Sequence, residues 1–471
     1  MRNMKESIVD TPRVSEILSA CISSGDPSAA SAVVERARDK KGFGVEDAAK
    51  IIGALGDPDF DRRLFEAAAS VKKDIYGERL VFFAPLYLSN RCANDCAYCN
   101  FKSAHSALKR ADLSVEEITR ETASLLSMGH KRLLLESGES PEFGVERVTE
   151  AIRAIYSVKT RFGSIRRVNV NIAATSTENY RKLKSAGIGT YQLFQETYHP
   201  AAYADVHPRG PKSDYIRQIT AHDRAFEAGI DDVGLGVLFG LYDWRFEALC
   251  LIEHATRLEK KHGVGPHTIS VPRFRPADGV EYAPRYAVSD EDFLRIIAIL
   301  RLAVPYTGLI ISTRERPDIR AKAFGIGISQ ASAASATGVG GYGVRASGTA
   351  KSVGAKAGQF AVSDERPLAD VVASALKDGL LPSFCTACYR RGRTGEKFME
   401  LAKPAEIHNF CRPNAILTFA EYLEDFAAPA VYRKGMAVIE KTLAAVEDAA
   451  MRQNTRSALD RIKNGERDVY F

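Results

Sequence analysis

The stretch "RLVFFAPLYLSNRCANDCAYCNF", residues 79–101, joins a long apolar run to a loop that carries three cysteines. The apolar run indicates a strand. The polar residues that follow end this strand and place Cys92, Cys96 and Cys99 in a C-x3-C-x2-C pattern. Barrels of alternating strands and helices keep their chemistry on loops at the carboxyl ends of their strands. The stretch therefore predicts both an element of the fold and the position of a site.

Seven further strand-like runs follow, with helical patterns between them. The helical stretches, such as 114–129, 177–187, 213–229 and 289–303, often begin at a Ser, Thr or Asp cap, and several end in Gly. Eight strands separated by helices predict an α/β fold, a (β/α)8 TIM-type barrel. The seven runs are KRLLLES (131–137), RRVNVNIA (166–173), TYQLFQE (190–196), DDVGLGVLFG (231–240), HTISVP (267–272), TGLIIS (307–312) and IGISQAS (326–332).

The segments on either side of the barrel lead us to expect four parts in the chain. Residues 1–77 have helical apolar spacing and form an N-terminal helical extension, and residues 78–335 form the barrel. Residues 336–364 belong to a Gly/Ala-rich stretch without periodicity, which predicts a loop or lid. Residues 365–471 form a C-terminal helical domain that carries a second group of cysteines.

The composition argues against several classes of protein. The 471 residues include 65 Lys and Arg and 59 Asp and Glu, a net charge of +6, with no basic stripe, so we expect no nucleic-acid partner. No signal peptide is recognisable, and no stretch approaches the roughly 20 apolar residues that span a membrane. We therefore expect a cytoplasmic protein without a membrane partner. In that compartment, cysteines are metal ligands or catalysts more often than disulfides.

The first cysteine group favours an iron–sulfur cluster. Three thiolates this close in sequence can bind three irons of a 4Fe–4S cubane and leave the fourth iron open. The alternatives are a zinc knuckle or three unrelated thiols. Zinc knuckles prefer paired C-x2-C units, and the sequence offers no fourth ligand nearby. Of the eight cysteines, Cys21 and Cys250 stand alone on helical patterns, where buried structural thiols are expected.

The second group, Cys385, Cys388 and Cys411, has the pattern C-x2-C-x22-C. Its spacing leaves three interpretations open, one of which is that the cysteines are unrelated to one another. His408 lies three residues before Cys411, so the four side chains match a Cys3His zinc site. An iron–sulfur cluster is also compatible, and it would again have one iron without a thiolate.

The first motif, with an aromatic residue before its last cysteine, resembles the signature of radical S-adenosylmethionine (SAM) enzymes. The resemblance implies that a 4Fe–4S cluster binds and reductively cleaves SAM, and that the resulting 5′-deoxyadenosyl radical abstracts hydrogen from a substrate. It further implies that Glu139, in "ESGES", holds the methionine amino group, and that "GVLFG" lies under the adenine. The implied SAM-site residues are Tyr98, Glu139, Asn171, Glu196, Gly236 and Gly240.

Residues 382–423, "PSFCTACYRRGRTGEKFMELAKPAEIHNFCRPNAILTFAEYL", resemble the HydG family of [FeFe]-hydrogenase maturases, and similar stretches cover roughly residues 80–335. The resemblance implies a tyrosine lyase that breaks the Cα–Cβ bond, giving p-cresol and dehydroglycine. Dehydroglycine then yields carbon monoxide and cyanide for assembly of the hydrogenase active site. The implied partners are L-tyrosine, cysteine, an electron donor such as ferredoxin or flavodoxin, and other hydrogenase-maturation proteins.

The same resemblance implies a role for the second cysteine group. Cys385, Cys388 and Cys411 would bind an auxiliary 4Fe–4S cluster whose open corner leads to an additional iron, which collects carbon monoxide and cyanide. His267, in "GVGPHTISVP", matches the family's ligand of that iron. Because His267 precedes the sixth strand, we expect the two clusters at opposite ends of one barrel, with His408 turned away from the second.

Three positions depart from the family pattern. Asn100 replaces a usual Gly, and in "SAASAT" (332–337) Ala334 and Ala336 replace Gly and a basic residue at the expected rim of the substrate cavity. Arg314 is then the candidate for binding the carboxylate of an amino acid, since Arg forms bidentate pairs with carboxylates; a surface Arg that caps a helix is the alternative. Two other functions stay open: a HydG-like lyase for another amino acid, and a non-catalytic iron–sulfur carrier.

Overall fold

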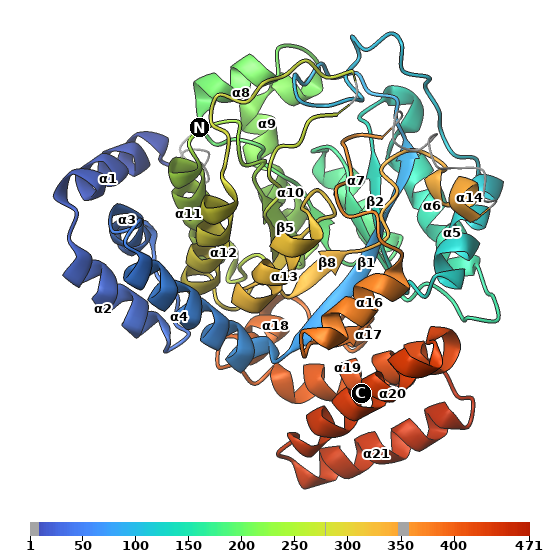
Figure 1. Cartoon of the computed structure of the whole chain (residues 1–471). Coiled ribbons are helices and arrows are strands. Elements are labelled where there is room, and N and C mark those ends of the chain that lie inside the picture. Colours follow the sequence, from blue (N-terminus) through green and yellow to red (C-terminus); the bar gives the residue numbers. More distant parts are fainter. Residues whose placement is uncertain (1–8, 278, 347–357) are drawn as a thin grey trace.

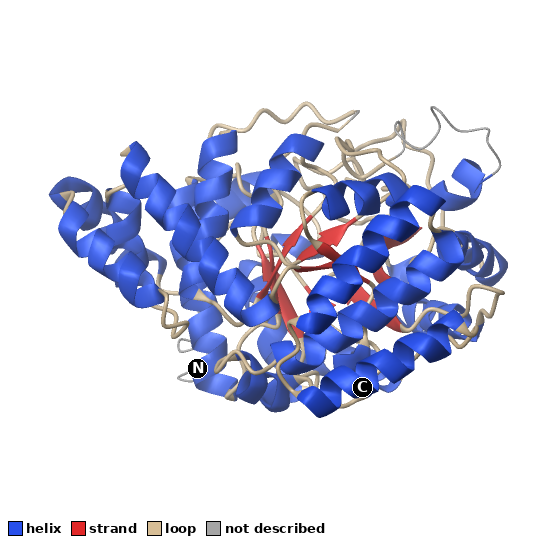
Figure 2. Ribbon diagram, turned by 60° about the horizontal axis from the view of Figure 1, so that its bottom comes forward, coloured by secondary structure: helices blue, strands red, loops and turns tan. Residues whose placement is uncertain are grey.

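The computed structural model describes residues 9–277, 279–346 and 358–471, and eight parallel strands lie at its centre (Figures 1 and 2). The strands follow the order β2-β3-β4-β5-β6-β7-β8-β1, and β1 also pairs with β2, so the sheet closes. The predicted (β/α)8 barrel is therefore confirmed. Its strands are β1 (Arg79–Ser89), β2 (Arg132–Ser137), β3 (Arg167–Asn171), β4 (Tyr191–Gln192), β5 (Val233–Gly236), β6 (Thr268–Ser270), β7 (Gly308–Ile311) and β8 (Gln330–Ser332).

Side chains of the strands alternate between the inside of the barrel and the layer under the helices. On β2, Leu133 and Leu135 belong to the main core, whereas Leu134 lies in a separate cluster inside the barrel with Phe83 and Ile310. The residues two positions away from Leu134 share its inward face. Arg132 and Glu136 therefore also face the interior, toward opposite ends of the barrel.

Helices surround the barrel, and several begin at the predicted caps (Figure 2). Ser114 forms a capping box with Glu117 at the start of α5, and Ser289 caps α12. The predicted helix over 213–229 is divided at Thr220 into two short helices. The helices of this layer are α5 (Val115–Ser127), α6 (Val145–Ser157), α7 (Thr177–Ser185), α8 (Pro200–Val206), α9 (Tyr215–Ile219), α10 (Ala221–Glu227), α11 (Trp244–His262), α12 (Asp290–Ala303) and α13 (Pro317–Ile326). Two 3-10 turns, η2 (Pro141–Phe143) and η3 (Pro211–Ser213), lie in its loops.

The N-terminal segment is helical and lies against one side of the barrel (Figure 1). Asp57 caps the longest of its helices by accepting a hydrogen bond from the Phe60 amide. In this segment α3 packs against α11, and α4 packs against α12. The helices are α1 (Thr11–Ser24), α2 (Pro27–Ala37), α3 (Val45–Gly53) and α4 (Pro58–Tyr76).

The C-terminal segment adds a ninth strand that the sequence did not predict. Strand β9 (Leu381–Ser383) pairs in parallel with the first residues of β1, so Arg79 lies opposite Leu381. It has only three residues, and Pro382 lacks an amide donor, a residue tolerated at the edge of a sheet. The helices of this segment are α16 (Leu368–Lys377), α17 (Ala387–Arg390), α18 (Gly395–Ala402), α19 (His408–Phe426), α20 (Pro429–Ala444) and α21 (Ala449–Lys463).

The Gly/Ala-rich stretch after β8 is not entirely irregular, because α14 (Gly341–Ala346) lies within it. Residues 347–357 of the predicted lid lie outside the described residues. Among the helices that the structure describes, none is both long enough and apolar enough to cross a membrane.

Candidate active site and second cysteine cavity

A cavity opens at the carboxyl ends of the barrel strands, and all three cysteines of the first group line it. Cys92, Cys96 and Cys99 lie on the loop that follows β1. Gly138, on the loop after β2, allows the two loops to meet, since a Cβ atom there would lie 2.1 Å from the Arg91 carbonyl oxygen. Burial raises the pKa of the Cys96 thiol, and it raises the pKa of Cys99 to about 11. Thiols in such a place ionise when a metal supplies positive charge.

The polar residues predicted to hold SAM surround the same cavity. Glu139 accepts hydrogen bonds from Asn94 (2.7 Å) and from Arg217 (2.6 Å). Glu196 has a positive φ of 69° and forms an ion pair with Lys212 at 2.6 Å. Asn171, at the end of β3, also lines the cavity.

Of the aromatic and glycine residues predicted for the SAM site, only the aromatic residue lines the cavity. Tyr98 lines the cavity, and its hydroxyl lies 2.8 Å from His207 Nε2. Gly236 and Gly240 are not among the lining residues, whereas Leu238, between them, is. Gly236 instead leaves room for the Phe194 ring, because a Cβ atom there would lie 2.3 Å from that ring.

Arg314 faces the same cavity and is not a surface residue that caps a helix. Its guanidinium group lies 3.4 Å from the centre of the Phe360 ring. Within the described ranges, no carboxylate lies within 4.0 Å of its side chain. Ala334 and Ala336, expected at the cavity rim, are buried and do not line it, whereas Ser335 does.

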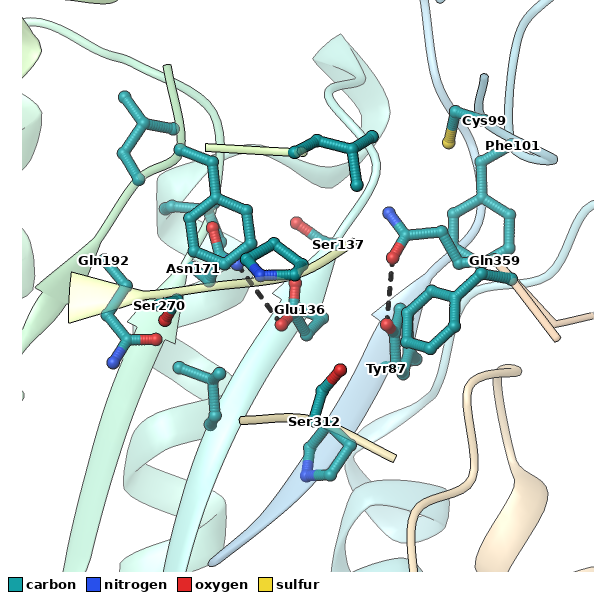
Figure 3. Close-up of a pocket in the computed structure, with 18 of the residues that line it drawn as sticks. Tyr87, Cys99, Phe101, Glu136, Ser137, Asn171, Gln192, Ser270, Ser312 and Gln359 are labelled. Carbon is teal, nitrogen blue, oxygen red and sulfur yellow. Dashed lines mark hydrogen bonds between the residues drawn. The ribbon is translucent and has the colours of Figure 1, made fainter. Parts of the chain in front are cut away.

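Residues 358–360, within the Gly/Ala-rich stretch, form a segment that covers part of the cavity. Gln359 accepts a hydrogen bond from the Tyr87 hydroxyl at 2.9 Å (Figure 3). The fully buried Asn100 donates from Nδ2 to the Gly358 carbonyl oxygen at 2.6 Å. The departure at position 100 thus connects the cysteine loop to this covering segment.

Four residues that the sequence analysis did not select also belong to this site: Glu136, Lys212, Arg217 and Gln359. The sequence contained enough information to select Glu136, because this residue begins the motif "ESGES" and lies two positions after Leu134, on the same inward face of β2. Lys212 and Arg217 come from a long connection after β4 that carries no motif. Their side chains reach the site only through the fold of that connection.

A second cavity lies at the opposite end of the barrel, and it is lined by Cys385, Cys388, Cys411 and His267. Cys385 follows β9, and Cys411 lies on α19. The amino ends of strands also contribute, with Arg79 and Val81 from β1 and Arg132 from β2. A hydrogen bond with Cys411 lowers the pKa of the Cys388 thiol.

His267 is held firmly at this cavity. Its Nδ1 atom lies 3.0 Å from the Asp232 carboxylate, and its ring stacks on Phe398 with centroids 4.0 Å apart. Burial raises the pKa of Asp232, but the charge and hydrogen bond of His267, together with Thr190 and Arg167, outweigh burial, and the net shift is downward. A carboxylate on Nδ1 leaves Nε2 free for a metal, which is a common arrangement of metal-binding histidines. His408 does not line the cavity; its Nδ1 contacts the Ala405 carbonyl oxygen.

Comparison with known proteins matches this arrangement to two sequence families. Residues 86–250 match the Radical SAM superfamily, and residues 270–381 match the Biotin and Thiamin Synthesis associated domain. A parallel barrel with a C-x3-C-x2-C loop after its first strand therefore defines an enzyme of the radical SAM superfamily.

A crystal structure of HydG, described as a maturase of the [FeFe]-hydrogenase, is 47% identical, with 98% of this chain and 99% of that one covered and a TM-score of 0.93. HydG from Carboxydothermus hydrogenoformans is 40% identical over the same shares, with a TM-score of 0.83. The 2-iminoacetate synthase of Salmonella typhimurium is 35% identical over 287 residues, 60% of this chain and 74% of that protein. The chain belongs to the HydG family.

Membership in the superfamily implies a 4Fe–4S cluster that binds SAM. The first cavity fits such a group, because three thiols meet carboxylates and amides that suit the amino and carboxylate ends of SAM. Within the described parts of the chain, no three His, Cys, Asp or Glu side chains are placed to hold a single metal ion.

Proposed function

We propose that this enzyme cleaves the Cα–Cβ bond of L-tyrosine to p-cresol and dehydroglycine, and that dehydroglycine yields carbon monoxide and cyanide for [FeFe]-hydrogenase assembly. Dehydroglycine is another name for 2-iminoacetate, so the proposal agrees with the names of both groups of relatives. The reaction needs an external electron donor, for which a ferredoxin or flavodoxin is suitable.

One observation carries the proposal: the chain has a second three-cysteine cavity, which His267 also lines, at the far end of the barrel. A lyase that only released its product would need only the first cavity. A second cluster site that opens into the barrel gives small fragments a place of capture. The alternative function, a non-catalytic iron–sulfur carrier, does not explain why Glu139, Glu196 and Arg314 line the first cavity.

In the first cavity, the bound cluster and SAM supply a 5′-deoxyadenosyl radical. The protein positions the reactants. Cys92, Cys96 and Cys99 hold the cluster, while Glu139, Asn171 and Glu196 hold SAM. Arg314 binds the substrate carboxylate, since its guanidinium lies beside Phe360 in the cavity and has no carboxylate partner in the described residues. The apolar layer of Phe83, Leu134 and Ile310 suits an aromatic side chain.

In the second cavity, Cys385, Cys388 and Cys411 would hold an auxiliary 4Fe–4S cluster, with His267 as ligand to an additional iron that is cargo. The Asp232 contact fixes the His267 ring and favours Nε2 as the ligand atom. Cysteine would complete the iron–carbonyl–cyanide product. The position of His408, outside the cavity lining, supports an open cluster corner.

A lyase for another amino acid is the second candidate, because Ala336 stands where the family pattern has a basic residue. Ala336 is buried, and the Tyr342 hydroxyl contacts its amide, so its side chain does not reach the substrate cavity. Tyrosine therefore remains the preferred substrate.

The deciding experiment uses anaerobic, reconstituted full-length protein with SAM and dithionite. Tyrosine should raise 5′-deoxyadenosine formation above the uncoupled rate and give p-cresol, cyanide and carbon monoxide. Cys96→Ser should lose 5′-deoxyadenosine formation entirely. Stimulation by tryptophan or another amino acid, with none by tyrosine, would support the second candidate. Undiminished SAM cleavage by Cys96→Ser would remove the first cysteine group from the SAM site.

A further inference from the structure

Glu136 is a carboxylic acid in the first cavity that the roles above leave unassigned. It is the inward residue of β2 next after Leu134, and it lies opposite Tyr87 in the strand register. Figure 3 shows its carboxyl group inside the cavity, with one oxygen hydrogen-bonded by Asn171 Nδ2 at 3.3 Å. Among the described residues, its second oxygen accepts no hydrogen bond. One face of the carboxyl group is thus available to a ligand.

Arg314 faces the same cavity from the loop after β7, and the two charges do not pair with each other. In the described chain, no Arg or Lys nitrogen lies within 4.0 Å of the Glu136 carboxylate. An α-amino acid carries a carboxylate and an ammonium group on one carbon atom. The cavity therefore presents a complementary pair of sites, a cation for the carboxylate and an anion for the ammonium group.

We propose that Glu136 binds the α-ammonium group of the amino-acid substrate and accepts one of its protons, while Arg314 holds the carboxylate. The inference rests on the proposed lyase function and adds a catalytic acid–base residue to it. In this step an N–H bond of the ammonium group breaks and an O–H bond forms at Glu136. The products are a neutral amine and a neutral carboxylic acid, and no electron is transferred.

The chemistry of the product gives this proton transfer its purpose. The carbon–nitrogen double bond of dehydroglycine uses the nitrogen lone pair, which the ammonium form holds in an N–H bond. A substrate that binds as a zwitterion must therefore release a proton before it forms a neutral imine. Asn171 donates to one Glu136 oxygen, so the free oxygen is the one that receives the proton.

The surroundings of Glu136 suit a base that works near neutral pH. Burial raises its pKa to about 8, against the opposing effects of the Asn171 hydrogen bond and the Arg314 and Lys212 charges. Glu196 adds to the rise, and the Tyr87 phenol also faces this carboxyl group. The basic form is populated above about pH 8, so kcat/KM for tyrosine should rise with pH up to that value and then level off. A pKa near the working pH is favourable for a general base.

The test compares wild type, Glu136→Gln and Glu136→Asp as anaerobic holoenzymes with SAM. Glu136→Gln should form p-cresol roughly 100-fold more slowly or worse, the typical contribution of a positioned base. Uncoupled 5′-deoxyadenosine formation without tyrosine is measured for each variant, and p-cresol formation is expressed relative to it, because Asn171, the hydrogen-bond partner of Glu136, lies at the SAM site. Glu136→Asp should keep part of the activity and the rise with pH. The matched control is Glu142→Gln, the same change at an exposed residue of the loop that follows β2.

A role in packing alone would not change the pH profile, so that profile is decisive. Glu136→Gln should lose the rise near pH 8 and regain p-cresol formation only as the amine of free tyrosine deprotonates. Tyrosine binding, measured calorimetrically in two buffers of different ionisation enthalpy, should show a proton exchange that the Gln variant lacks. A Gln variant that matches the wild-type rate and pH profile overturns the inference alone. A wild-type enzyme that forms no p-cresol overturns the proposed function, and the inference with it.

Discussion

Asn100→Ala should loosen the segment that covers the first cavity. Asn100 Nδ2 donates to the Gly358 carbonyl oxygen at 2.6 Å, and the residue is fully buried. A buried hydrogen bond of this kind contributes about 1 kcal/mol net, which corresponds to a factor of about five in an equilibrium constant. The other contacts of the segment remain, including the hydrogen bond from Tyr87 to Gln359. The ratio of closed to open forms should therefore fall about fivefold, without loss of the fold.

Hydrogen exchange on the anaerobic holoenzyme measures this ratio directly. Peptides that contain residues 358–360 should exchange about five times faster in the variant, and KM for tyrosine should rise by about the same factor. Iron content should not change. Ser106→Ala, at an exposed residue of the same loop, serves as the control. Unchanged exchange in these peptides would refute the role of Asn100.

Three further variants test other parts of the site. His267→Ala should retain both cubanes and SAM cleavage but lose the additional iron and the infrared bands of its carbonyl and cyanide ligands, because the Asp232-oriented ligand is gone; His408→Ala is the control, and iron bound through His408 would contradict the assignment. Arg314→Ala should weaken tyrosine binding by about 2 kcal/mol, or about 30-fold in a binding titration, since a charged pair is lost; an unchanged affinity would remove Arg314 from the site. Ala334→Gly should raise the free energy of unfolding by about 1 kcal/mol in denaturant titrations, because Ala334 has a left-handed φ of 51°; no gain would show that this backbone is not strained.

The sequence predicted the barrel well because its signals are local. Each strand is a short apolar run, and caps such as Ser114 and Ser289 mark the start of the helix between two strands. The cysteine loops were equally visible, since spacing within one loop is a property of the sequence. His267 was identified by resemblance, and the fold places it in the cavity that the second cysteine group lines.

The elements that the sequence missed depend on distant parts of the chain. Strand β9 has three residues including Pro382, and it is a strand only because the edge of β1 offers hydrogen bonds. The division at Thr220 has a similar origin, since Arg224 donates both to the Thr220 hydroxyl and to the carbonyl oxygen of Thr175, a residue of the preceding βα loop, and a period of 3.6 residues does not reveal the second bond. The role of Glu136 needed the inward face of β2, which follows from barrel closure.

The pairing of β9 with β1 has a consequence for the order in which the enzyme matures. Strand β1 finds β2 soon after synthesis, whereas the partner of Arg79, Leu381, emerges from the ribosome only after the whole barrel sequence. Contacts between residues so far apart in sequence form late in folding. Of the two cysteine loops, the one that carries Cys385 therefore reaches its final position later. We expect the SAM cluster site to mature first during synthesis and refolding, so that the site of radical chemistry exists before the site that stores its products.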